Sequence, residues 1–305
     1  MQVKNIYSNF KKWQAKKRYS NTYLIFTIFN YIILILVALT CLLPLINVLA
    51  VSLSEKSAVE AGKVGFVPVN FTFDSYGYVF STPAFYSALW ISIKRTVLGT
   101  LISLVVTTLL AYAMSRPTAQ FRGRSVYMVI IVISMLFSGG LVPTYIIIAN
   151  GLGLKDTIWA LVLPGAVHIY SAIIMMNFFR QLPRDIEEAA YIDGADHFQT
   201  MIKIILPCSL PIIATVVLFV FINQWNSWFD GLIYNSQPEN YPLQTYLQQF
   251  MAEPPKINID SMFVQISNNS LASANIFIIM LPIVIIYPAL QKYFIKGMVL
   301  GSVKG

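Results

Sequence analysis

Charged residues are scarce in this chain of 305 residues, and their scarcity argues against most classes of soluble protein. Only 11% of the residues are Asp, Glu, Lys or Arg, whereas 57% are hydrophobic. A soluble domain carries about 25% charged residues, and a chain this apolar would expose large hydrophobic patches to water. The composition therefore predicts a protein that resides in a membrane.

Cysteine and histidine are also scarce, with two residues of each. Cys41 and Cys208 fall in or beside apolar segments, so we expect no disulfide, and two cysteines make no metal site. The sequence has no G-x-x-x-x-G-K-[ST] nucleotide loop, no H-E-x-x-H zinc motif and no G-x-S-x-G nucleophile motif. Since little material for acid–base catalysis remains, we expect a protein that is not an enzyme and binds no metal or cofactor itself.

Long apolar stretches are abundant. Six of them contain no charged residue and are each at least 20 residues long, which is roughly the length that a helix needs to cross a bilayer. The first stretch is too long for a signal peptide and ends at no small-residue cleavage site. We therefore expect an all-α, multi-pass membrane protein with six transmembrane helices. The stretches cover residues 19–54, 96–115, 125–154, 157–179, 204–229 and 261–291.

The basic residues indicate an orientation. If the N-terminus lies in the cytoplasm, most of the 21 Lys and Arg fall on the cytoplasmic side of the membrane. The positive-inside rule therefore predicts that both termini are cytoplasmic. This rule and the attraction of anionic lipid headgroups explain the formal charge of +8, so we expect membrane lipid and no nucleic acid as a partner.

These features predict one membrane domain without an internal repeat. Residues 1–22 form a basic cytoplasmic arm, residues 23–300 the transmembrane domain, and residues 301–305 a cytoplasmic tail. The two longest connections late in the chain are a cytoplasmic loop, 181–207, and an external loop, 230–269.

The cytoplasmic loop is unusually acidic. Pro183 and the pair Asp185-x-x-Glu188 predict a helix start, and the short helix, 186–192, is expected to end at Gly194 in the left-handed conformation. Five of the 13 acidic residues lie here: Asp185, Glu187, Glu188, Asp193 and Asp196.

A second short helix is expected to begin near Ala195-Asp196 and to run until Pro207 disrupts it. Ala189 and Ala190 would leave a bare face beside carboxylates that can meet arginines of another protein. The segment thus favours a docking element. The alternative is an amphipathic linker on the membrane surface, although such helices usually carry Lys and Arg rather than clustered carboxylates.

The same loop carries a family motif. Glu188-Ala189-Ala190, Gly194, Ile204 and Leu206-Pro207 match the E-A-A-x3-G-x9-I-x-L-P pattern of binding-protein-dependent ABC importer permeases at every fixed position. Over nearly its full length the chain resembles the smaller permease of maltose-type carbohydrate importers. The stretches LVPTY, at 141–145, and PLQTY, at 242–246, resemble the subgroup that serves complex polysaccharide fragments.

The resemblance implies an ABC importer type I permease fold in the inner or plasma membrane of a bacterium. It also implies a second permease subunit as heterodimer partner, an ABC ATPase dimer that binds ATP and Mg, an extracellular or periplasmic solute-binding protein, and an oligosaccharide as cargo. The loop would be the coupling helix that fits a cleft of the ATPase. The residues implied in this coupling are Glu187, Glu188, Ala189, Ala190, Asp193, Gly194, Ala195, Asp196, Leu206 and Pro207.

A path for the solute is expected through the third to fifth apolar stretches. Adjacent glycines after Ser138 suggest local unwinding, which membranes tolerate where backbone lines a cavity. A histidine in mid-span is a candidate functional residue, although a neutral imidazole bonded to a neighbouring helix is the favoured interpretation. Sugars bind to aromatic faces and amides, but Trp225 and Trp228 could instead belong to the aromatic belt. The candidate path residues are Ser138, Gly139, His168, Tyr170, Asn223, Trp225, Asn226, Trp228 and Asp230.

An alternative function is an ATP-independent secondary carrier or channel for a small polar solute. Such carriers usually show paired halves and buried ionisable residues, and this sequence offers neither apart from His168.

Overall fold

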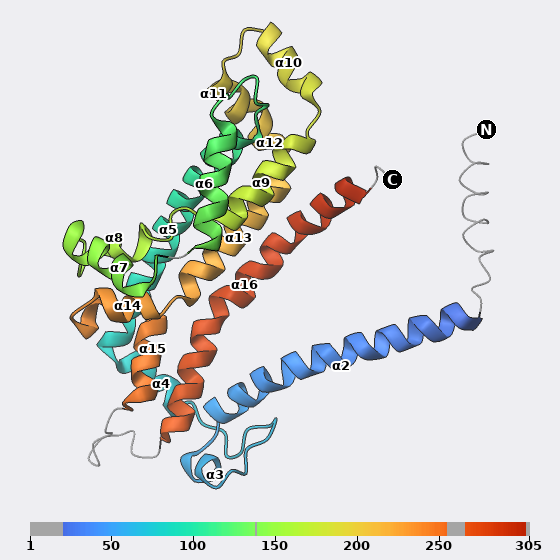
Figure 1. The fold of residues 1–305 in the computed structure, drawn as a ribbon. Coiled ribbons are helices and arrows are strands. Elements are labelled where there is room, and N and C mark those ends of the chain that lie inside the picture. The colour runs from blue at the N-terminus through green and yellow to red at the C-terminus, as the bar shows by residue number, and fades with distance from the viewer. Residues whose placement is uncertain (1–20, 138, 255–265, 303–305) are drawn as a thin grey trace.

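The regular structure of the protein is helical, as expected. The computed structural model describes residues 21–137, 139–254 and 266–302, and within them the only β-pairing is one isolated bridge between Ser54 and Phe71. The helices are α2 (Asn21–Ser52), α3 (Lys56–Glu60), α4 (Asp74–Ser81), α5 (Pro83–Ser115), α6 (Arg124–Leu136), α7 (Leu141–Tyr145), η1 (Ile146–Gly151), α8 (Ile158–Val162), α9 (Ile169–Gln181), α10 (Arg184–Ile192), α11 (His197–Thr200), η2 (Met201–Ile205), α12 (Leu206–Cys208), α13 (Leu210–Asn226), α14 (Phe229–Tyr234), η3 (Pro238–Asn240), α15 (Leu243–Ala252) and α16 (Asn268–Ser302) (Figure 1).

Three helices are long and apolar enough to cross a membrane unaided: α2, α5 and α16. Two bent helix pairs are each long and apolar enough for a further span when the two helices are taken together. The angle is 113° between α6 and the α7–η1 segment and 85° between the α11–α12 segment and α13. In the first pair, Gly140 has a φ of +83° in the break, so the unwinding predicted at these glycines is confirmed.

The fourth expected span, 157–179, is divided. Helix α8 ends at Val162 and α9 begins at Ile169, with Pro164 and Gly165 in the non-helical stretch between them. Proline removes a backbone donor and clashes with the preceding turn, and here a glycine, which is a weak helix former, follows it directly, so both residues favour a break at this point. All six apolar stretches contain helix, but only three of them are single unbroken helices.

Helix α5 begins thirteen residues earlier than the charge-free stretch that predicted it, because Pro83 stands at its first turn, where proline is favoured. Lys94 and Arg95 therefore lie inside this helix. Lys94 stays exposed over the ring of Trp90, whereas Arg95 is buried.

Helix α5 is the centre of the bundle and packs against α9 and α13, while α16 packs on α13. Its buried face consists mostly of small or hydroxyl-bearing side chains, which let neighbouring backbones approach closely in a membrane protein. These are Ala88, Ser92, Thr96, Gly99, Thr100, Ser103, Thr107, Thr108 and Ala111.

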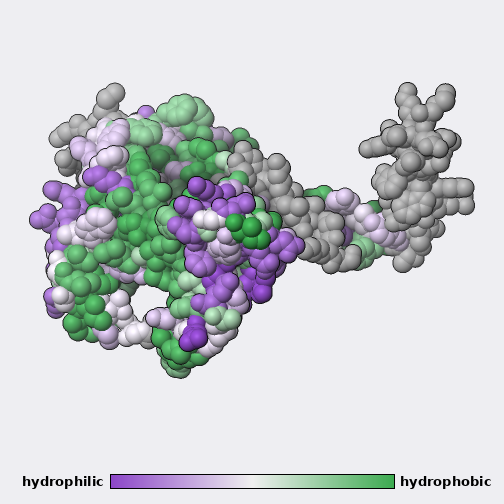
Figure 2. Space-filling view, turned by 90° about the horizontal axis from the view of Figure 1, so that it is seen from above, coloured by the Kyte–Doolittle hydropathy of each residue, from purple (hydrophilic) through white to green (hydrophobic). Residues whose placement is uncertain are grey.

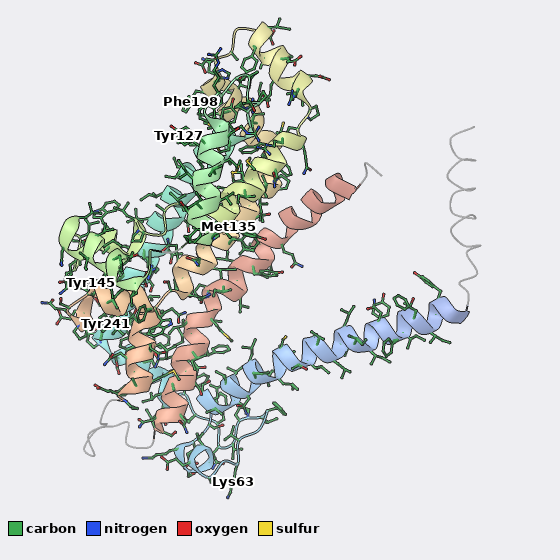
Figure 3. All side chains as sticks on the ribbon, viewed as in Figure 1. Lys63, Tyr127, Met135, Tyr145, Phe198 and Tyr241 are labelled. Atoms are coloured by element: carbon green, nitrogen blue, oxygen red, sulfur yellow. The ribbon has the colours of Figure 1, made fainter. Side chains whose placement is uncertain are left out.

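The molecule has two distinct ends. Helices α10 and α11 form one end, marked by Phe198 in Figure 3, and α3, α4 and α15 lie toward the other, where Lys63 is labelled. Helix α2 leaves the bundle and contacts it mainly through α16 (Figure 1). Its most apolar stretch buries no residue within the chain, so this surface is available to lipid or to another subunit.

Candidate functional site

The acidic segment forms two short helices with a sharp turn between them. Helix α10 ends in a Schellman arrangement: the N–H of Gly194 donates to the carbonyl of Tyr191 at 3.1 Å, and the N–H of Ala195 donates to that of Ala190 at 2.9 Å. Gly194 has a φ of +83°, which lies in the left-handed region that residues with a Cβ rarely adopt. The predicted role of Gly194 as the stop between two helices is confirmed.

The predicted start of α10 was wrong by two residues. The helix begins at Arg184 after Pro183, and no side chain caps it, so Asp185 and Glu188 form no capping pair. Asp185 and Glu187 instead lie inside the first turn, where negative charge interacts favourably with the helix dipole.

The second helix begins as expected. Asp196 caps α11 by accepting a hydrogen bond from the backbone N–H of Gln199 at 2.7 Å. Helical structure continues through η2 and α12, and the bend falls at Ser209, two residues beyond Pro207. Leu206 and Pro207 thus lie at the base of this segment, next to the bend.

The outer face of the two helices combines apolar and acidic residues. Glu188, Ala189, Asp193 and Asp196 are exposed, whereas Ala190 is buried. Figure 2 looks onto this end of the molecule and shows hydrophilic residues with hydrophobic ones among them. Among the apolar side chains of α10 and α11, the most exposed are Ile192, at 86%, and Phe198, at 61%.

Glu187 turns inward and pairs with Arg116. The guanidinium group donates to both carboxylate oxygens, one of them at 2.9 Å, and it also lies 4.3 Å from the ring centroid of Tyr112. Burial disfavours the charge on Arg116, but the hydrogen bond and the attraction of Glu187 outweigh it and raise the pKa of Arg116. Glu187 therefore fastens α10 to the end of α5 and does not face outward.

The second helix is fastened to α5 as well. The hydroxyl of Tyr112 donates to the carbonyl of His197 at 3.0 Å, and the hydroxyl of Tyr191 lies 2.8 Å from Nδ1 of His197. Both helices of the acidic segment are thus held by one turn of α5, so the segment can move as one body with that helix.

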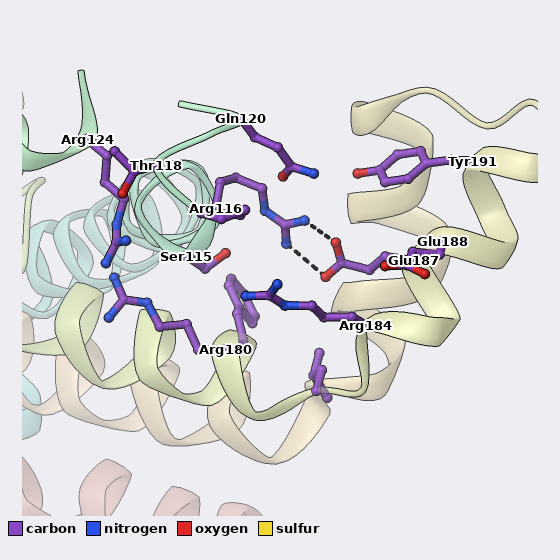
Figure 4. A pocket seen from close by; sticks show the side chains of 13 residues that line it. Ser115, Arg116, Thr118, Gln120, Arg124, Arg180, Arg184, Glu187, Glu188 and Tyr191 are labelled. Carbon is purple, nitrogen blue, oxygen red and sulfur yellow. Dashed lines mark hydrogen bonds and ion pairs between the residues drawn. The ribbon is translucent and has the colours of Figure 1, made fainter. Parts of the chain in front are cut away.

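A cavity of about 430 Å³ lies behind the acidic segment, between the end of α5, the start of α6, the end of α9 and α10 (Figure 4). Arg124 and Arg180 both donate to the carbonyl of Met114, at 3.0 and 2.9 Å. Burial and the repulsion of Arg124 lower the pKa of Arg180.

Near the other end of α5, a buried polar network joins Arg95 to the end of α13 and to α14. Arg95 pairs with the carboxylate of Asp230 and donates to the carbonyl of Ser227 at 3.1 Å and to Oε1 of Gln224 at 3.2 Å. Asp230 also accepts from the backbone N–H of Gly231 at 2.9 Å. The carboxylate of Asp230 therefore already has its ion-pair and hydrogen-bond partners within the chain.

Gln224 sits between two glycines. A Cβ on Gly99 would lie 2.6 Å from the Cδ atom of Gln224, and one on Gly165 would lie 3.2 Å from its Nε2 atom. Only glycine therefore fits at Gly99 without displacing the Gln224 side chain.

The structure separates the residues predicted for the solute path. Ser138 lies outside the described residues, and Gly139 lies in the break after α6. His168 caps α9: its Nδ1 atom lies 2.8 Å from the hydroxyl of Ser171 and accepts from the backbone N–H of Ser171. The imidazole is thus bonded to the first turn of the helix that it begins, and not to a neighbouring helix.

The side chain of Trp225 also makes its contacts within the chain. It is buried against Phe221, and its Nε1 donates to the carbonyl of Ile279 at 3.0 Å. Its side chain is therefore part of the packing within this chain. Trp228, in contrast, is partly exposed, and its carbonyl accepts from Thr245.

The remaining candidates share a face. Phe219, Asn223 and Asn226 recur at helical spacing along α13, and all three are exposed. Tyr170 of α9 is exposed beside Phe219, with ring centroids 6.4 Å apart. This face of α13 therefore combines aromatic and amide side chains.

Beyond the end of α13, α15 contributes to a second cavity, of about 300 Å³. Tyr78, Glu239, Tyr241, Tyr246 and Gln249 are among its lining residues. The external loop expected at 230–269 thus contributes aromatic and polar side chains to one cavity.

Sequence reasoning missed five residues that organise these regions: Arg95, Arg116, Ile192, Phe198 and Gln224. A lone arginine within an apolar helix, four residues before Gly99, was the available signal for Arg95. The partners of Arg95 and Arg116, 135 and 71 residues away, could not be read from spacing. Within the described residues, no group of three or more His, Cys, Asp or Glu side chains could hold a metal ion.

Residues 15–300 match the family described as binding-protein-dependent transport system inner membrane component. The polygalacturonan/rhamnogalacturonan transport system permease protein YtcP of Bacillus subtilis (strain 168) is 37% identical over 285 residues, 92% of this chain and 99% of that protein. Protein LplC of the same organism is 39% identical over 284 residues, 92% of this chain and 95% of that protein.

A solved structure is similar as well. A chain of a bacterial ABC transporter involved in the import of the acidic polysaccharide alginate superposes with a TM-score of 0.81 and 33% identity, covering 90% of this chain and 99% of that one.

Proposed function

This chain belongs to the family of binding-protein-dependent transport system inner membrane components and is a permease subunit of an ABC importer, and on that premise we propose how it works and what it carries. The cargo is an oligosaccharide released from a polysaccharide, and the acidic segment couples its import to a separate ATPase.

The observation that carries this proposal is the acidic segment itself. Two short helices meet at Gly194, present exposed carboxylates and exposed apolar side chains, and are fastened to α5 by Glu187 and Tyr112. A surface linker would need neither a fixed turn nor a buried ion pair. A rigid projection that moves with a central helix can pass a rigid-body movement from a partner into the bundle.

The two glutamates have different roles in this proposal. Glu187 holds the projection to α5, whereas Glu188 is exposed and free to meet a basic residue of the ATPase. Ile192 and Phe198 would supply the apolar centre of that contact, since exposed apolar side chains on a short surface helix favour a protein partner.

The solute would pass along the face of α13 that carries Phe219, Asn223 and Asn226. Exposed amides are unfavourable against lipid tails, so this face is expected to meet water or another polar surface. A second permease subunit placed against it would enclose a passage lined by aromatic and amide groups. Trp228, and Tyr170 beside Phe219, complete the group.

The cargo class follows from the relatives. One of them is named for polygalacturonan and rhamnogalacturonan, and the structural neighbour for alginate, so fragments of uronic-acid polysaccharides are the first candidates. ATP and Mg would be bound by the partner ATPase, and a solute-binding protein would deliver the sugar on the outer side. The protein would lie in the bacterial inner membrane with both termini in the cytoplasm. The family is binding-protein-dependent, which argues against an ATP-independent carrier.

The test is reconstitution. The chain is purified with its second permease subunit, the ATPase and the binding protein, and ATP hydrolysis and oligosaccharide uptake are measured in vesicles. We expect the loaded binding protein to stimulate both. Uptake of the same oligosaccharide without the ATPase would overturn the proposal.

A further inference from the structure

The cavity behind the acidic segment carries a net positive charge, and the proposed contact with the ATPase does not involve this charge. Four arginines line it, Arg116, Arg124, Arg180 and Arg184, against two carboxylates, Glu187 and Glu188 (Figure 4). The lining therefore carries two more positive than negative charges. The remaining lining residues are Ser115, Pro117, Thr118, Gln120, Phe179, Leu182 and Tyr191.

Three of the four arginines have no ion-pair partner among the described residues. In the part of the chain that the structure describes, Arg116 is the only one of the four that forms an ion pair, with Glu187. Even so, Arg116 is nine-tenths buried, and its Nε atom has no hydrogen-bond partner among the described residues.

Two of the arginines are brought together without an acid between them. Arg124 and Arg180 each donate one N–H to the same acceptor, the carbonyl of Met114. A guanidinium group has five N–H donors, so most donors of this pair are left for a ligand. Two cations that share one carbonyl repel each other, and an anion placed between them would remove that repulsion.

We propose that this cavity binds a phosphate group. Arginine forks match the oxygens of a phosphate and form short, charge-assisted hydrogen bonds with them. The cavity lies where α5 and α9 end and α6 begins. In the expected topology these are the cytoplasmic ends of apolar helices, where anionic lipid headgroups attract basic residues. Two sources share this chemistry: the headgroup of an anionic phospholipid and free inorganic phosphate.

The experiment uses the full chain, purified in detergent and depleted of lipid. Native mass spectrometry measures the binding of phosphatidylglycerol and of phosphatidylcholine, and thermal unfolding measures the effect of inorganic phosphate against sodium chloride at equal ionic strength. The variants are Arg124→Gln/Arg180→Gln and Arg184→Gln. Arg122→Gln is the matched control, because Arg122 is an exposed cation of the same loop that does not line the cavity.

We expect the wild type to prefer phosphatidylglycerol, and the double variant to lose roughly tenfold or more of that affinity, since each basic residue near a membrane surface contributes measurably to anion binding. Arg184→Gln, which removes a side chain with no ion pair in the described chain, should lose severalfold and serves if the double variant does not fold. Arg122→Gln should bind as the wild type does.

A rise in thermal stability with phosphate alone, lost in the same variants, would identify free phosphate as the ligand. The proposal is overturned if neither ligand depends on these arginines, or if Arg122→Gln weakens binding as much as the double variant does.

Discussion

At the scale of single residues, the acidic segment depends on one backbone conformation. Gly194 has a φ of +83°, yet a Cβ there would meet no atom within 4 Å. The requirement for glycine is therefore conformational and not steric, so substitutions should rank by their tolerance of the left-handed region.

We predict that Gly194→Val costs roughly 1–2 kcal/mol at this turn and tilts α10 relative to α11. ATPase pull-down and sugar uptake should both fall, while membrane insertion stays normal. Gly194→Asn is the matched control, because asparagine tolerates this conformation, and it should retain most activity. Normal uptake in Gly194→Val would show that the angle between the two helices does not matter.

A second prediction separates the adjacent glutamates. Glu188→Lys should weaken ATPase binding by about 2–5 kcal/mol, because two cations would then face each other at a partly desolvated contact, and it should leave the stability of the chain unchanged. Glu187→Gln should instead lower the thermal stability of the chain, since it leaves Arg116 buried without its partner. Equal effects of the two substitutions on pull-down and on stability would contradict this division of roles.

At the scale of elements, helix α13 has one face that packs in the core and one that is exposed. One face packs in the core through Val216, Val220 and Trp225, and the other exposes Phe219, Asn223 and Asn226. The amide-rich end of this helix is therefore part core and part open surface.

We predict that Asn226→Ala and Trp228→Ala lower sugar uptake without a change in assembly of the complex. Trp225→Ala should instead destabilise the chain by roughly 3–5 kcal/mol, because it empties a buried site and removes the hydrogen bond to Ile279. Uptake assays in vesicles and thermal unfolding of each variant distinguish the two effects. A sugar-uptake defect in Trp225→Ala at wild-type stability would place this residue on the path after all.

Helices α5 and α14 are joined by the ion pair between Arg95 and Asp230. Arg95→Met should cost roughly 3 kcal/mol, because it leaves a largely buried carboxylate unpaired. The double variant Arg95→Met/Asp230→Asn should recover much of that loss, which thermal unfolding of both variants would measure. A double variant less stable than the single one would show that Asp230 is held by its other contacts.

At the scale of the whole molecule, two surfaces of the chain are left uncovered. Helix α2 leaves its apolar surface uncovered, and the proposed path lies on an open face of α13. The surface of α2 requires lipid or a second subunit, whereas the amide-bearing face of α13 requires water or a polar partner surface.

We predict that the purified chain alone hydrolyses no ATP, and that hydrolysis appears only with the second permease subunit and the ATPase, stimulated by the loaded binding protein. Phosphate release is measured for the chain alone and for the full complex. Robust ATP hydrolysis by the chain alone, with a specific activity that rises with the purity of the preparation, would contradict the proposal that the nucleotide site belongs to the partner ATPase.

The sequence by itself determined the membrane class, the positions of the apolar stretches and the acidic segment, because these follow from local composition and from motifs of fixed spacing. It also determined the turn at Gly194 and the start of the second helix near Asp196, since both rest on hydrogen bonds within a few residues. Only the tertiary structure decided which charges are paired. Arg95 with Asp230 and Arg116 with Glu187 meet because helix packing brings distant segments together, and the same packing turned Trp225 inward and gathered four arginines around one cavity.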